Sequence, residues 1–198
     1  FAIIPRSAIA HKAPTIFPFS VDGKFALCLY STLCSFALDY SVRQNVGGSS
    51  LSFFILKQLP VFSPKIFENK CQWSNEKIQD WLLPRVLELT YTAWDLEPFA
   101  QDCGFNGPPF RWDEARRFLL RCELDAAFFH LYGIERDDVA YIMDTFPIVK
   151  RKDEAVHGSY RTRDTILDMY DAMISGQPYQ TRLDPPPADV RCCHPIKS

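Results

Sequence analysis

Residues 113–132 carry the clearest secondary-structure signal in this sequence, and they predict one long helix. Asp113 is a favoured N-cap residue, and Gly133 is a favoured residue just past a helix C-terminus. One face of the predicted helix repeats at three- and four-residue spacing and is flanked by leucines; its members are Phe118, Cys122, Asp125 and Phe129. The chain has 198 residues and is 47% hydrophobic, so one domain or two small ones can bury such a helix.

The same half of the chain predicts a helical domain over residues 71–176. We expect short helices from about Ser74 and Thr92, another over residues 135–143, and a last helix from Thr162 to just before Gly176. Residues 146–149 are predicted to be extended. Residues 177–198 contain three consecutive prolines and predict a polyproline tail.

Residues 1–65 predict a smaller part that contains β-structure. We expect strands or loops in the Pro-punctuated residues 1–21, a buried helix over 24–44, a Gly-Gly turn, and a strand over 51–57. The apolar run 25–42 is interrupted by Asp39 and is short for a membrane span, so no membrane partner is predicted. The predicted fold class is α+β, mostly helical, with a small β-containing N-terminal part followed by a helical C-terminal part.

The formal net charge of −2 hides an uneven distribution of charge. Residues 1–70 contain seven Lys or Arg against three Asp or Glu, whereas residues 71–198 contain fifteen against twenty-one. The first part therefore has the charge expected of a surface that meets nucleic acid, and the second does not.

Seven cysteines without a CxxC pair indicate free, buried thiols and a cytoplasmic protein. Cys192, Cys193 and His194 are adjacent, but they lie in a Pro-flanked tail without a fourth ligand nearby. We therefore predict no metal site.

Three stretches together resemble the C-terminal end of large adenine-specific bacterial DNA methyltransferases, the single-chain type IIG-like restriction–modification enzymes. They are residues 38–61, with the sequence ILKQLP; residues 121–134, with ELDA and LYG; and residues 141–149, continued by 158–162. The resemblance covers most of residues 25–175. In that family, this region holds target recognition and a helical cap, and the methyltransferase core lies upstream.

The resemblance implies a DNA-recognition fragment that is inactive alone. Its partners would be double-stranded DNA and the upstream methyltransferase domain, and the whole enzyme would use S-adenosylmethionine to methylate adenine N6. The chain opens on Phe1 rather than Met, which we interpret as the loss of the catalytic part. Gly47-Gly48 is not the cofactor-binding loop, and in residues 106–110 the inserted Gly107 breaks the Asn-Pro-Pro-Tyr/Phe motif. No catalytic residue and no cofactor are predicted for the fragment.

The best candidates for DNA contact lie between residues 43 and 57. A helix end, a turn with exposed N–H groups and a following cation could meet phosphates and base edges; these residues are Arg43, Gln44, Asn45, Gly47, Gly48, Ser49, Ser50 and Lys57. An ordinary solvated helix C-terminus with a glycine turn fits the same residues. Residues 150–152 form a second basic stretch, which fits either a phosphate contact or a solvated loop.

The alternative function is a helical scaffold that packs on the methyltransferase domain and hardly touches DNA. The acidic second half favours it, because Arg116, Arg117 and Arg121 of the predicted 113–132 helix have acidic neighbours and suit paired surface charge. If residues 43–57 bind DNA, Arg43→Ala should weaken binding more than Arg116→Ala.

Overall fold

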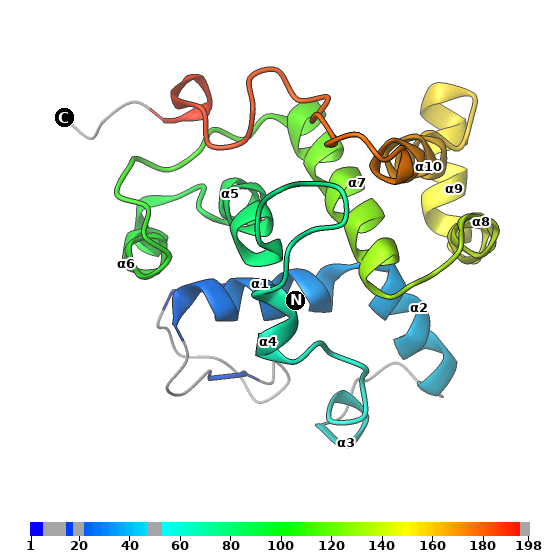
Figure 1. Cartoon of the computed structure of the whole chain (residues 1–198), viewed down its shortest axis with the longest axis horizontal. Coiled ribbons are helices and arrows are strands. Elements are labelled where there is room, and N and C mark those ends of the chain that lie inside the picture. The colour runs from blue at the N-terminus through cyan, green and yellow to red at the C-terminus, as the bar shows by residue number, and fades with distance from the viewer. Residues whose placement is uncertain (6–14, 18–21, 47–52, 195–198) are drawn as a thin grey trace.

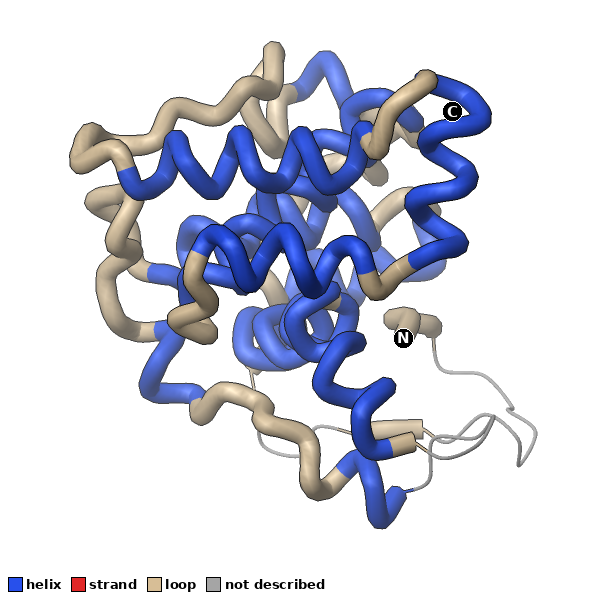
Figure 2. Tube along the Cα trace, turned by 90° about the vertical axis from the view of Figure 1, so that its right-hand side faces the viewer, coloured by secondary structure: helices blue, strands red, loops and turns tan. Residues whose placement is uncertain are grey.

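The computed structural model describes residues 1–5, 15–17, 22–46 and 53–194, and in these ranges it consists of helices joined by loops, without a strand (Figures 1 and 2). The mostly helical character is therefore confirmed. The α-helices are α1 (Gly23–Cys34), α2 (Phe36–Asn45), α3 (Phe53–Leu56), α4 (Pro64–Phe67), α5 (Ile78–Thr90), α6 (Glu97–Asp102), α7 (Glu114–Leu131), α8 (Arg136–Asp144), α9 (Pro147–His157) and α10 (Arg161–Ile174). Two 3₁₀ turns cover Trp94–Leu96 and Val190–Cys192.

Helix α7 is the predicted 113–132 helix and lies at the centre of the fold. The Asp113 carboxylate accepts a hydrogen bond of 2.9 Å from the Arg116 N–H and caps the helix, and Gly133 follows it with a φ of +65°. Figure 1 shows α7 running between α5 and α10, and it packs against both of them and against α2. Its apolar surface is wide enough to contact helices on several sides.

One main hydrophobic core joins the two predicted parts of the chain. Leu27 and Cys28 of α1 belong to the same buried cluster as Trp81 of α5, Phe128 of α7 and Met169 of α10. The boundary predicted near residue 65 therefore does not separate two hydrophobic cores. A smaller cluster of Leu33, Leu38 and Leu59 lies beside it.

The predicted single helix over residues 24–44 is two helices that meet at an angle of 60°. Ser35 interrupts the helix with an extended backbone, and its hydroxyl accepts a hydrogen bond from the Leu38 N–H as the N-cap of α2. Asp125 of α7 accepts a second bond from the Phe36 N–H, at 2.8 Å. Within the described ranges no single helix is long and apolar enough to cross a membrane; only α1 and α2 taken together, bent as they are, pass that test.

The predicted β-containing part is wrong for the residues that can be assessed. The strand expected over 51–57 is helical from Phe53 to Leu56, and residues 1–5 and 15–17 form no strand. A short, uninterrupted apolar run lacks the alternation of a half-buried strand, so periodicity alone cannot assign it. Residues 146–149 are also not extended, because Pro147 begins α9, a position that proline favours.

Residues 177–194 are docked onto the helical body instead of forming a polyproline tail. The Tyr179 N–H donates to the Trp73 carbonyl at 2.7 Å, and Leu183 is buried. The Ala188 N–H donates to the Glu88 carboxylate at 3.1 Å. In polyproline II the backbone N–H and C=O groups are solvated. In this segment, backbone groups form hydrogen bonds with side chains and carbonyls of the helical body instead.

Candidate nucleic-acid interface

The end of α2 presents three of the residues predicted to contact DNA, and all three are exposed. Arg43 forms an ion pair with Asp39, one turn earlier, with 2.9 Å between Nη2 and Oδ2. Its guanidinium carbon also lies 4.6 Å from the centre of the Phe146 ring. The Asn45 amide donates to the Ser41 carbonyl at 2.9 Å and leaves its own oxygen available as an acceptor.

Phe146 joins this corner to the second basic stretch. It is the N-cap residue of α9, and its carbonyl accepts the Lys150 N–H, so residues 150–152 lie about one helical turn away. Lys150 pairs with Asp144 at 3.1 Å. Arg151 and Lys152 are exposed and form no ion pair with any residue in the described part of the chain. Folding thus brings together two basic stretches that are far apart in the sequence.

Lys57 lies on a segment that packs beside α2. Ile55, Leu56 and Leu59 flank Lys57 and pack in the small cluster with Leu38 of α2. Lys57 itself is exposed. The remaining predicted contact residues, which are Gly47, Gly48, Ser49 and Ser50, lie outside the residues that the structure describes.

Cationic side chains in this corner suit phosphate oxygens, and the amides of Gln44 and Asn45 suit base edges. Phe146 is the part of the corner that the sequence analysis missed. A ring that supports a guanidinium has no local sequence signal, because its partner is distant along the chain. The contact arises only in the folded chain, where Phe146, between α8 and α9, packs against Phe36 and Arg43 of α2.

The prediction of paired surface charge was wrong for Arg116 and Arg117, which are both buried. Arg116 is paired with Glu88 of α5 through its Nε and, at 3.1 Å, its Nη2. Glu123, one of the acidic residues of the same helix, is fully buried against Arg85. Only Arg121 keeps an exposed pair, with Glu114 at 3.1 Å. Arg116 is therefore an unsuitable control in a DNA-binding comparison, because replacing it disturbs the core.

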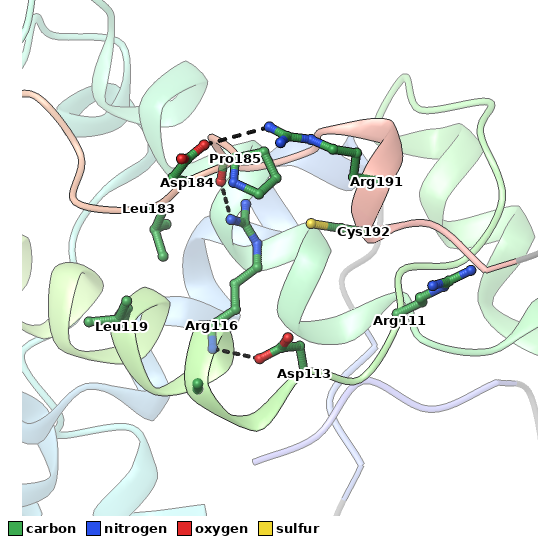
Figure 3. Close-up of a pocket in the computed structure, with 10 residues that line it drawn as sticks. Arg111, Asp113, Arg116, Leu119, Leu183, Asp184, Pro185, Arg191 and Cys192 are labelled. Carbon is green, nitrogen blue, oxygen red and sulfur yellow. Dashed lines mark hydrogen bonds and ion pairs between the residues drawn. The ribbon is translucent and has the colours of Figure 1, made fainter.

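A pocket of about 380 Å³ lies where the C-terminal segment crosses the start of α7 (Figure 3). Arg116 reaches across it to the Pro185 carbonyl, and Asp113 caps the helix at its edge. Arg191 pairs with Asp184 at 3.6 Å. The bonds of Arg116 and Arg191 hold residues 184–191 against the start of α7 and against one another.

The structure also places two stretches that the sequence analysis set aside. Cys192, Cys193 and His194 do not gather with other ligands, and no cluster of potential metal ligands occurs among the described residues. Residues 106–110 lie in the loop between α6 and α7. Phe110 stacks on Phe105, the residue just before this range, and its N–H donates to the Tyr91 carbonyl. The loop is thus attached to the residue that ends α5.

Comparison of the chain with models of protein families, with curated proteins and with solved structures finds no match. The functional argument therefore rests on the residues of this chain and on their geometry.

Proposed function

We propose that this chain is the DNA-recognition, C-terminal part of a bacterial adenine-N6 DNA methyltransferase of the restriction–modification type. Its catalytic core and S-adenosylmethionine site would lie in the upstream domain. The resemblance of residues 38–61, 121–134, 141–149 and 158–162 supports the class. The observation that carries DNA contact is the position of Arg43 on Phe146, beside the basic start of α9.

In this proposal, the end of α2 and the first turns of α9 meet the duplex together. Arg43 exchanges Asp39 for a phosphate, at little cost because their ion pair is exposed. Arg151 and Lys152 add further phosphate contacts, which fix the register of the protein on the DNA. Gln44 and Asn45 then face base edges, where their amides pair best with adenine.

Arg43→Ala is expected to weaken binding to duplex DNA and to lower its salt dependence. The loss of one phosphate contact reduces the slope of log K against log salt concentration by about 0.9. Fluorescence anisotropy with a labelled duplex, at several salt concentrations, measures both quantities. Arg136→Ala is the matched control, because Arg136 is equally exposed and is paired with Asp171 at 2.8 Å. Equal effects of the two variants would reject the α2 corner as the interface.

The chain alone is expected to transfer no methyl group from S-adenosylmethionine to DNA, because it would lack the catalytic core. Incubation with labelled cofactor and duplex DNA, followed by counting of the labelled DNA, tests this directly. The appearance of N6-methyladenine that depends on the chain would contradict the assignment of catalysis to the upstream domain.

The scaffold alternative is favoured by one observation, the exposed apolar surface of α3 and the loop after it. The side chains of Phe53, Phe54 and Val61 are 54%, 75% and 44% exposed. Adjacent exposed aromatic residues suit a protein interface better than a DNA backbone. If the wild-type chain binds no duplex even at low salt, the scaffold function replaces the DNA-contact proposal.

A further inference from the structure

A second cavity, of about 500 Å³, lies between α7 and the helices around it. Most of its wall is apolar and comes from α1, α2, α5, α7 and α9, including Phe36, Val86, Leu89, Phe118 and Val149. Its volume falls within the range of roughly 300–1,000 Å³ that is usual for small-molecule sites. None of the residues proposed to contact DNA lines it, so this cavity is independent of the proposed function.

One strongly polar group stands out in the wall, the guanidinium of Arg117. Arg117 is only 9% exposed, and its Nε has no hydrogen-bond partner among the described residues. Nη1 donates to the Leu89 carbonyl at 3.0 Å, and the guanidinium carbon lies 3.6 Å from the centre of the Trp112 ring. The Leu89 carbonyl and the Trp112 ring thus hold the side chain in one orientation, while the Nε and Nη2 donors form no hydrogen bond with the described residues.

The other two buried arginines show what Arg117 lacks. Arg85 is paired with Glu123 and Arg116 with Glu88, in both cases through two guanidinium nitrogens. No carboxylate of the described residues forms an ion pair with Arg117, although it is as buried as the other two. A guanidinium keeps its charge in proteins, and a buried charge without a counter-ion is costly. Glu114 and Glu88 act on the Arg117 charge only from beyond ion-pair distance. The cavity therefore carries a buried positive charge that no carboxylate of the described residues contacts directly.

The other acidic and basic side chains of the wall, Arg121 and Asp125, form no ion pair with Arg117. Arg121 lies one turn further along α7 and is a second cation in the wall. It forms an ion pair with the exposed Glu114. Asp125 also lines the cavity, but one of its oxygens is bonded to the Phe36 N–H. Burial raises the pKa of Asp125 to about 7, so at pH 6 this carboxyl group is mostly neutral.

From this arrangement we infer that the cavity binds a small amphiphilic carboxylate, with its carboxylate on the Arg117 guanidinium and its apolar body against the walls from α1, α5 and α7. The Nε atom is enclosed by protein and Nη1 is bonded to the Leu89 carbonyl, so the ligand would accept a hydrogen bond from Nη2. A carboxylate accepts such a charge-assisted bond more strongly than a neutral hydroxyl does. Binding supplies the counter-ion that the fold withholds, and it covers apolar surface at the same time.

Octanoate and octan-1-ol are matched probes for this site, because they share an apolar chain and differ in the charged head group. Isothermal titration calorimetry of the full chain at pH 6 should give an affinity for octanoate about tenfold or more above that for octan-1-ol, as expected for a charge-assisted hydrogen bond. Equal affinities, or tighter binding of the alcohol, would overturn the inference without any variant.

Three variants locate the site. Arg117→Met keeps the length of the side chain and should weaken octanoate binding about tenfold or more, with little effect on octan-1-ol. Val149→Trp narrows the cavity and should weaken both ligands. Arg136→Met removes an exposed cation that does not line the cavity and should change neither. Unchanged octanoate binding by Arg117→Met would show that the anion binds elsewhere and would reject the assignment.

Discussion

Glu123→Ala is expected to lower the free energy of unfolding by about 3–5 kcal/mol, because it leaves the Arg85 charge buried without a partner. Glu123 is 0% exposed, and its Oε2 lies 2.9 Å from the Arg85 Nε. Arg85 cannot move into water easily, since its guanidinium lies 3.7 Å from the Trp81 ring centre and donates to the Trp81 carbonyl at 2.7 Å. Urea denaturation followed by circular dichroism measures the loss.

The control for Glu123→Ala is Asp171→Ala, which removes the partner of the exposed Arg136. That change should cost at most about 1 kcal/mol, as is usual for exposed ion pairs. Replacing both buried partners, Arg85→Met with Glu123→Leu, should recover much of the lost stability, because no charge then remains buried. A Glu123→Ala loss as small as that of Asp171→Ala would show that Arg85 finds water or another acceptor.

Asp125→Asn is expected to remove a pH-dependent loss of stability between about pH 4 and pH 7. Burial raises the pKa of Asp125 from its ordinary 3.8 to about 7, so in this interval the folded chain binds a proton that the unfolded chain releases. The carboxyl group therefore contributes its full stabilisation of the folded state below about pH 4. This contribution falls as the pH rises and is lost once the pH has passed 7. The total difference is about 4 kcal/mol.

Asparagine suits this test because its amide oxygen can still accept the Phe36 N–H that caps α2. The free energy of unfolding of both proteins, measured by urea denaturation from pH 4 to pH 8, should converge at the acid end, apart from a constant offset. At pH 8 the variant should be more stable by up to the same amount. Parallel curves across this range would show that Asp125 ionises normally in the folded chain.

Helix α7 could be predicted from the sequence because its signals are local. The capping carboxylate of Asp113 lies three residues from the N–H that it accepts, and Gly133 ends the helix by its own backbone freedom. The bend between α1 and α2 was missed for the opposite reason. Ser35 supplies a local cap, but Asp125 of α7 provides the second acceptor from far along the chain.

The sequence could show which residues are suited to contact DNA, but it could not show which of them lie together on one surface. Arg43, Gln44 and Asn45 could be placed at a helix end from the glycines that follow them. That Arg43 would lie on Phe146, beside the basic start of α9, depends on how α8 and the residue after it pack against α2. The cavity at Arg117 was missed because an unpaired buried charge looks in a sequence like any other member of a mixed-charge helix.

The sequence by itself determined the helical character of residues 71–176, the limits of α7 and the uneven distribution of charge, since each depends on spacing or composition within a few turns. Only the tertiary structure decided which arginines of α7 are paired, which is left without a carboxylate, and that residues 177–194 are docked. Charges three or four residues apart compete with partners on other helices, and burial decides between them, because a desolvated cation gains far more from an acceptor than a solvated one does.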